Sequence, residues 1–170
     1  DRLSGEFGDD QLIAGTGEDT FEGGDGADTV DYSASADTAI SVSVTGGGGD
    51  SFSGIEGVIG MAGADTLDFS AASFAVTLDG GNGDDILLGA NGNDFLVGGN
   101  GNDRFFAGNG DDTFFGSSGR DTVDYSASSN TAINVWQGGG GGDLFSNIMA
   151  IIGTAGADTI TLTHPIGVTI

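Results

Sequence analysis

The sequence predicts an all-β fold in which short parallel strands stack into a flattened solenoid. A nine-residue unit recurs along the chain, and each unit opens with a glycine-rich turn and closes with a short apolar run. On a longer scale, residues 30–69 return 93 places later as residues 123–162, with 25 of 40 positions identical. Fixed periods of this kind are typical of repeat architectures, in which each unit buries its apolar face against its neighbours.

Two positions of the nine-residue unit are constant in character. The units begin at Gly5, Ala14, Gly23, Gly80, Gly89, Gly98, Ala107 and Gly116. The sixth position is always aspartate: Asp10, Asp19, Asp28, Asp85, Asp94, Asp103, Asp112 and Asp121. The eighth position is always apolar: Leu12, Phe21, Val30, Leu87, Leu96, Phe105, Phe114 and Val123. Because compositional bias alone does not keep two columns in register, a disordered low-complexity tail is the less favoured interpretation.

The chemistry of one unit explains the predicted stacking. Glycines at the first, second and fourth positions allow positive φ and close backbone approach, so this part is a tight turn with free carbonyl groups. The apolar run that follows is too short for a helix and suits one brief strand, which is not stable alone. Two units therefore form one coil of eighteen residues, with neighbouring coils about 4.8 Å apart and the eighth-position side chains inside.

This stacking places each turn aspartate above another aspartate. Such a column is repulsive unless a hard cation lies between the carboxylates, and ligation by oxygen alone favours calcium over zinc or copper. The overall charge is consistent with a need for bound cations, since the chain has 26 acidic residues and only three arginines, and its formal net charge is −23. The negative electrostatic potential of such a chain makes nucleic acid and anionic membranes poor partners.

Catalysis and membrane insertion are not expected. The chain has no cysteine and no apolar stretch of membrane-spanning length. Carboxylate pairs such as Asp84 and Asp85 recur in successive turns, and a site repeated along a column is more often structural than catalytic. We therefore expect a protein segment that is not an enzyme.

Four consecutive units, GGNGDDILL (80–88), GANGNDFLV (89–97), GGNGNDRFF (98–106) and AGNGDDTFF (107–115), resemble the calcium-binding nonapeptide repeat of RTX proteins. The intervening segments are similar to spacers within large RTX surface proteins. The resemblance implies a right-handed parallel β-roll with several calcium ions in the stacked turns.

The resemblance also implies a set of calcium ligands. One turn supplies its second and fourth carbonyls and its aspartate, and the turn eighteen residues later supplies its first and third carbonyls and its aspartate. In the second block, the implied sites are Gly81, Gly83 and Asp85 with Gly98, Asn100 and Asp103; Ala90, Gly92 and Asp94 with Ala107, Asn109 and Asp112; and Gly99, Gly101 and Asp103 with Gly116, Ser118 and Asp121. In the first block, Glu6, Gly8 and Asp10 face Gly23, Asp25 and Asp28, and Asp19 pairs with Asp1 in a truncated site.

The chain is expected to divide into a repeat block at 1–31, intervening coils at 32–79, a second block at 80–124 and a second intervening segment at 125–170. Asp50 and Asp143 follow runs of glycine, and Asp65 and Asp158 come fifteen places later, so the eighteen-residue spacing is lost. We expect these segments to continue the solenoid, mostly without calcium. A separate globular insert is the alternative.

Two classes of function remain open at this stage. In both, the resemblance implies export by a type I system of a Gram-negative bacterium. The first is a structural segment of a large secreted or cell-surface bacterial protein of adhesin, filament or surface-layer type, disordered without calcium and folding outside the cell. The second is the calcium-dependent export and folding module of a secreted toxin or hydrolase. Apolar residues at the outward seventh and ninth positions suggest a surface for self-association or for neighbouring modules: Ile86, Leu88, Phe95, Val97, Phe106 and Phe115.

Overall fold

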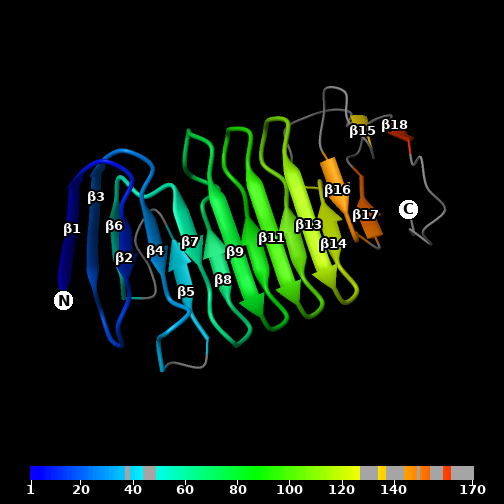
Figure 1. Cartoon of the computed structure of the whole chain (residues 1–170). Helices are drawn as coiled ribbons and strands as arrows, with labels where there is room; N and C mark the ends of the chain where they lie inside the picture. Colours follow the sequence, from blue (N-terminus) through cyan, green and yellow to red (C-terminus); the bar gives the residue numbers. More distant parts are fainter. Residues whose placement is uncertain are drawn as a thin grey trace.

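The computed structural model describes residues 1–36, 39–43, 49–126, 134–136, 144–148, 150–153 and 159–161. Regular secondary structure in these ranges consists of short strands, and every strand pair is parallel. The strands lie side by side along the length of the molecule, from blue at the N-terminus to orange (Figure 1). The predicted all-β parallel stack is therefore confirmed. In the same ranges, no helix is long and apolar enough to cross a membrane.

One face of the solenoid is a seven-stranded sheet in the order β16-β13-β11-β9-β7-β4-β2. Its strands are β2 (Gln11–Ile13), β4 (Thr29–Asp31), β7 (Gly57–Ile59), β9 (Thr77–Asn82), β11 (Phe95–Asn100), β13 (Thr113–Ser118) and β16 (Leu144–Ser146). This sheet receives strands from both nonapeptide blocks and from both intervening segments, so these parts of the chain belong to one solenoid.

The opposite face is divided between two sheets, of three strands in the order β1-β3-β6 and of six in the order β17-β14-β12-β10-β8-β5. The smaller sheet holds β1 (Arg2–Phe7), β3 (Thr20–Asp25) and β6 (Ser51–Ser53). The larger sheet holds β5 (Ser41–Ser43), β8 (Thr66–Asp68), β10 (Ile86–Leu88), β12 (Arg104–Phe106), β14 (Thr122–Asp124) and β17 (Ala150–Ile152). A separate pair is formed by β15 (Asn134–Trp136) and β18 (Thr159–Thr161).

The nonapeptide blocks stack with the predicted eighteen-residue offset. Thr20 lies beside Arg2 in the first block, and Arg104 lies beside Ile86 in the second. All eighth-position side chains are buried between the two faces, and most have no exposed surface. This confirms the predicted interior, because each strand turns every second side chain inward.

The intervening segment joins the same sheets with longer offsets than the nonapeptides use. β6 pairs with β3 (Thr20↔Ser51), β7 with β4 (Thr29↔Gly57), and β8 with β5 (Ser41↔Thr66). The consecutive strands β5 and β6 thus pair in opposite directions along the stack, β5 with the later strand β8 and β6 with the earlier strand β3. The stacking order of β5 and β6 is therefore the reverse of their order in the chain, at the place where the face divides into its two sheets, and we call this reversal the crossover of β5 and β6.

The second copy of the intervening segment repeats these pairings, shifted along the chain by one module. β16 pairs with β13 (Thr113↔Leu144), β17 with β14 (Thr122↔Ala150), and β18 with β15 (Asn134↔Thr159). The aromatic core is duplicated too, since the ring contacts of Phe21 with Tyr32 and Phe52 recur in the second copy. The corresponding rings there are Phe114, Tyr125 and Phe145. The long sequence repeat is therefore a repeat of strand pairing and packing.

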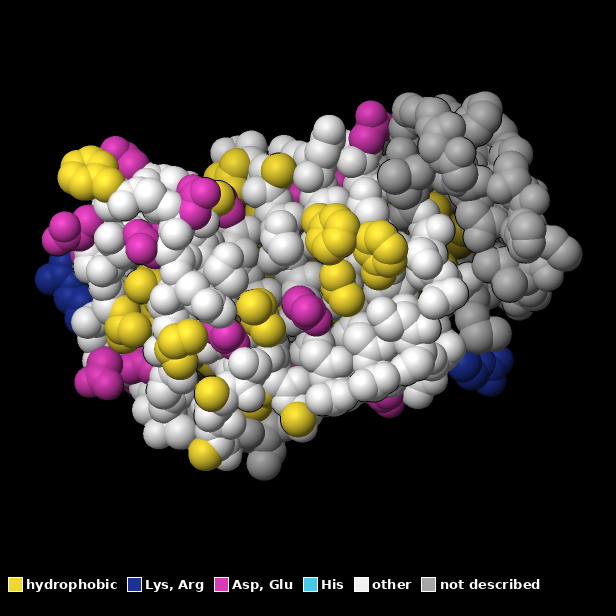
Figure 2. Space-filling model, viewed as in Figure 1, with side chains coloured by type: hydrophobic (Ala, Val, Ile, Leu, Met, Phe, Trp, Pro, Cys, Tyr) yellow, Lys and Arg dark blue, Asp and Glu magenta, His cyan; other side chains and the backbone are white. Residues whose placement is uncertain are grey.

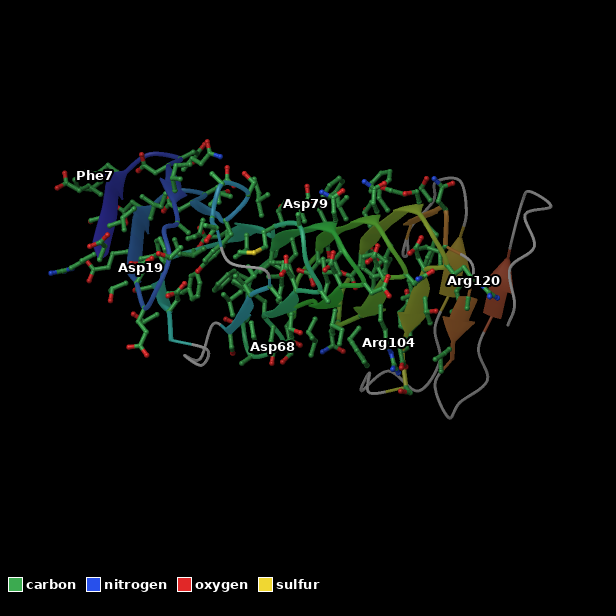
Figure 3. All side chains as sticks on the ribbon, turned by 90° about the horizontal axis from the view of Figure 1, so that it is seen from below. Phe7, Asp19, Asp68, Asp79, Arg104 and Arg120 are labelled. Atoms are coloured by element: carbon green, nitrogen blue, oxygen red, sulfur yellow. The ribbon has the colours of Figure 1, made fainter. Side chains whose placement is uncertain are left out.

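The outer surfaces of both faces carry the seventh- and ninth-position side chains. In the view from below, Asp79 lies outside one layer, whereas Asp68 and Arg104 lie outside the other (Figure 3). Figure 2 shows hydrophobic side chains gathered over the middle of the seven-stranded sheet. There the rings of Phe95 (43 % exposed) and Phe115 (37 %) contact each other, with centroids 5.2 Å apart.

Two phenylalanines of the second block allow a direct test of this arrangement. Phe105 is fully buried and Phe95 lies on the outer surface. We expect Phe105→Ala to lower the free energy of unfolding by about 3–5 kcal/mol, because it leaves a cavity. Phe95→Ala should lower it by less than about 1.5 kcal/mol, since a large part of the ring already faces water and its loss leaves no enclosed cavity. Thermal unfolding in calcium measures both, and equal losses would contradict the assignment of inside and outside.

Candidate metal sites in the stacked turns

The turn aspartates form two columns, one along each edge of the solenoid. Seven of the eight sixth-position aspartates are at most 4 % exposed: Asp19, Asp28, Asp85, Asp94, Asp103, Asp112 and Asp121. Asp10, in the outermost complete turn, is half-buried. Burial of a carboxylate is costly unless protein donors or a cation compensate it.

One oxygen of each of the seven buried carboxylates has a protein donor in the preceding coil. The N–H of Asp85 donates to Oδ1 of Asp103 at 2.9 Å, and the N–H of Asp103 donates to Oδ1 of Asp121 at 3.0 Å. The opposite edge repeats the contact between Asp94 and Asp112 at 2.9 Å. This ladder fixes the vertical alignment of the acids.

The ladder continues through the intervening segment, where sequence reasoning did not place it. The N–H of Asp19 donates to Asp50 at 2.7 Å, that of Asp28 to Glu56 at 3.0 Å, and that of Asp65 to Asp85 at 2.8 Å. The glycines before Asp50 and Asp65 are a signal for two of these partners. Glu56 follows no such turn, and its place depends on the register that sets β7 beside β4.

The second carboxylate oxygen is where the turns differ. Five turn aspartates have a buried Oδ2 atom without a hydrogen-bond partner in the described part of the chain: Asp10, Asp28, Asp85, Asp103 and Asp121. By contrast, Oδ2 of Asp94 accepts the N–H of Ala90 and Oδ2 of Asp65 accepts the N–H of Met61, both at 2.7 Å. Buried polar atoms are normally paired, so the five exceptions need a physical explanation.

The backbone conformation of the second turn residue correlates with whether the Oδ2 atom of the turn aspartate has a partner. It has positive φ in each of the five turns with an unpartnered oxygen: Glu6 (77°), Gly24 (115°), Gly81 (97°), Gly99 (102°) and Ser117 (67°). Ala90 and Met61 do not have positive φ, and their N–H groups reach the aspartate of their own turn. A left-handed second residue is therefore associated with an aspartate oxygen that remains available to a ligand.

Main-chain carbonyl oxygens line the space beside these free atoms. A Cβ atom placed on Gly80 would lie 2.4 Å from Oδ2 of Asp85 and 2.8 Å from the carbonyl oxygen of Gly98 in the next coil. A Cβ atom on Gly99 would lie 1.9 Å from the carbonyl oxygen of Gly81. Side chains would fill this space, which explains the glycines. Carboxylate and carbonyl oxygens are the donors that calcium prefers, so these residues fit calcium.

The space that could hold a cation is lined by backbone atoms more than by side chains. In the described ranges, no three acidic, histidine or cysteine side chains converge on one point. A cation between two coils would thus have two carboxylates and several carbonyl groups as ligands. This is a donor set that a search for clustered side chains does not detect.

Burial and neighbouring charge raise the pKa of the central aspartates. Burial raises the pKa of Asp85 to about 7, and the neighbouring charges of Asp103, Asp65 and Asp84 add to this, although the N–H of Asp65 opposes it. Burial likewise raises the pKa of Asp103 to about 6, with further contributions from Asp121 and Asp84. A cation in the column would lower both pKa values, because it stabilises the charged form of each carboxylate.

The structure stacks the turns whose residues were predicted as ligands. Gly81 pairs with Gly99, Asn82 with Asn100, and Asn100 with Ser118 in the sheet register. On the other edge, Asn91 and Asn109 form a bridge. In the first block, Glu6 pairs with Gly24 and Phe7 with Asp25. The main-chain nitrogen of Asp1 contacts Oδ1 of Asp19 at 2.6 Å.

Two acids of the intervening segment have both oxygens occupied by protein donors. Asp50 accepts the N–H of Asp19 and the hydroxyl of Tyr32, whose pKa is raised by burial. Asp65 accepts the N–H groups of Ile40 and Met61. Asp143 and Asp158 lie outside the described residues.

A family model described as RTX calcium-binding nonapeptide repeat (4 copies) matches residues 1–39, 69–96 and 88–123. Together these matches cover more than half of the chain and include both nonapeptide blocks except Asp124. A comparison with curated proteins finds no match.

The raised pKa values predict that acid stabilises the calcium-free fold. Protonated Asp85 and Asp103 contribute stability that is complete below about pH 4 and is lost as the pH rises through about 6 to 7. After removal of calcium, we expect circular dichroism to show a larger folded fraction at pH 5 than at pH 8. The variant Asp85→Asn/Asp103→Asn should show a smaller difference, because its amides do not titrate. A calcium-free parent that is more stable at pH 8 would contradict this explanation.

Proposed function

The chain belongs to the RTX calcium-binding nonapeptide repeat family, and from this premise we propose that it folds around a column of calcium ions held between successive turns. The observation that carries the proposal is the set of buried, unpartnered Oδ2 atoms beside main-chain carbonyl groups. The proposed ligands are the turn carbonyls and aspartates named from the resemblance. Calcium supplies the positive charge that the stacked carboxylates lack.

The turns differ in how well they support the proposal. The turns that end at Asp85, Asp103 and Asp121 combine a free Oδ2 atom with positive φ at the second residue. The turn that ends at Asp94 offers an oxygen that already accepts an N–H. We therefore propose tighter calcium binding on the edge that carries Asp85, Asp103 and Asp121 than at Asp94.

Calcium binding of modest affinity is sufficient to control folding. A site with a dissociation constant near 1 mM, which is usual for extracellular modules, contributes about 1.4 kcal/mol in a tenfold excess of calcium. A few such sites equal the stability of an ordinary domain. Without calcium, repulsion in both columns favours the unfolded chain.

The biological setting that we propose is a structural segment of a large secreted or cell-surface protein of adhesin, filament or surface-layer type. RTX repeats typically belong to secreted proteins. The duplication of the whole module, with the same strand pairings in both copies, supports an extending role. Export by a type I system of a Gram-negative bacterium, and contacts between modules or copies through the outward apolar side chains, belong to the same proposal. Sedimentation in calcium tests those contacts.

Asp103 offers the sharpest test of the proposed stacking, because it lies between Asp85 and Asp121 and would serve two ions. We expect Asp103→Asn to lose two bound calcium ions in a calorimetric titration. The matched control is Asp84→Asn, since Asp84 is exposed and contacts Asn102 of the next coil. It should keep the stoichiometry of the parent. A parent whose β spectrum is unchanged by chelator, or an Asp103→Asn variant with parental stoichiometry, would overturn the proposal.

A further inference from the structure

Asp28 is the last sixth-position aspartate of the first block, and the repeat pattern gives it no partner in the next coil. The residue eighteen places later is Gly46. Nevertheless, Asp28 is fully buried, and its Oδ2 atom has no hydrogen-bond partner. Its environment therefore resembles that of Asp85 and Asp103, although the sequence predicts the end of the column here.

The intervening segment brings a different acid to this place. β7 stacks on β4 with Gly57 beside Thr29, so Glu56 lies next to Asp28. The N–H of Asp28 donates to Oε2 of Glu56 at 3.0 Å, and the N–H of Glu56 donates to the carbonyl oxygen of Asp28 at 3.0 Å. Glu56 thus takes the role in the ladder that an aspartate has elsewhere.

Carbonyl groups that could bind a cation are present at this place as well. A Cβ atom on Gly23 would lie 2.4 Å from Oδ2 of Asp28 and 1.9 Å from the carbonyl oxygen of Gly54. A Cβ atom on Gly54, which has φ of 62°, would lie 3.1 Å from the carbonyl oxygen of Gly24. These contacts match those that Gly80, Asp85 and Gly98 make in the second block.

We propose that Asp28 and Glu56 bind a further calcium ion, together with the main-chain oxygens of Gly24 and Gly54. This inference rests on the proposed function, but it uses a ligand from outside the nonapeptides and a strand register that the nonapeptide period does not predict. The glutamate side chain is one methylene longer than that of aspartate, so it can reach the column from a coil without the usual turn. The ion would join the first block to the intervening segment beside the crossover of β5 and β6.

The second copy of the module lacks this acid. Asp121 corresponds to Asp28, and a Cβ atom on Gly116 would lie 2.4 Å from its Oδ2 atom and 2.5 Å from the carbonyl oxygen of Asn147. The residue that corresponds to Glu56 is Met149, which offers no carboxylate and lies outside the described residues. The proposed site is therefore a feature of the first copy.

Calorimetric titration of calcium into the whole chain tests the proposal. Glu56→Gln keeps an acceptor for the N–H of Asp28 but removes the charge, and we expect it to bind one calcium ion fewer than the parent. The control Glu22→Gln removes the same charge from the outer side of β3, where Glu22 pairs with Arg2. It should bind as many ions as the parent.

The outcomes separate this inference from the proposed function. A parent that binds no calcium contradicts both. A parent that binds calcium, together with a Glu56→Gln variant of equal stoichiometry and affinity, contradicts only the site at Glu56. If Glu56→Gln does not fold, Glu56→Asp decides: the proposal expects full stoichiometry with one site weakened at least tenfold, and parental affinity at every site overturns it.

Discussion

Stacked carboxylates in the turns are the constraint on which the rest of this structure depends. Parallel strands in register set neighbouring coils about 4.8 Å apart, and every turn must follow the same spacing. The acids at the end of each turn are therefore aligned above one another, and seven are almost fully buried. The glycines, the free carbonyl groups and the missing lysines of the sequence are all understandable as consequences of making room for cations in these columns.

The regular part of the fold could be predicted from the sequence because its information is local. Each nonapeptide contains its own turn, strand and interior residue, so Phe105 and Leu96 could be assigned to the core without knowledge of their neighbours. The eighteen-residue register follows because two units form one coil. The column of Asp85, Asp103 and Asp121 was predictable for the same reason.

The remaining features depend on contacts between distant segments, which a local period does not encode. The longer offsets of the intervening strands result from the crossover of β5 and β6. Glu56 enters the ladder because of the register that sets β7 beside β4. Likewise, the partner of the second carboxylate oxygen depends on one backbone torsion: Gly81 has positive φ, whereas Ala90 donates its N–H to Asp94. The duplicated module keeps the same pairings, so the crossover is a reproducible part of the fold and not an irregularity of one segment.

Anomalous diffraction from crystals grown in calcium tests the central claim most directly, because it locates the ions without reference to stability. We expect peaks about 2.3–2.6 Å from the free carboxylate oxygens, between the turns of Asp85 and Asp103 and between those of Asp103 and Asp121. The carbonyl oxygens of Gly81 and Gly98 should lie at the same range from the first of these peaks. Peaks confined to exposed acids such as Asp84, or an empty column in saturating calcium, would contradict the account.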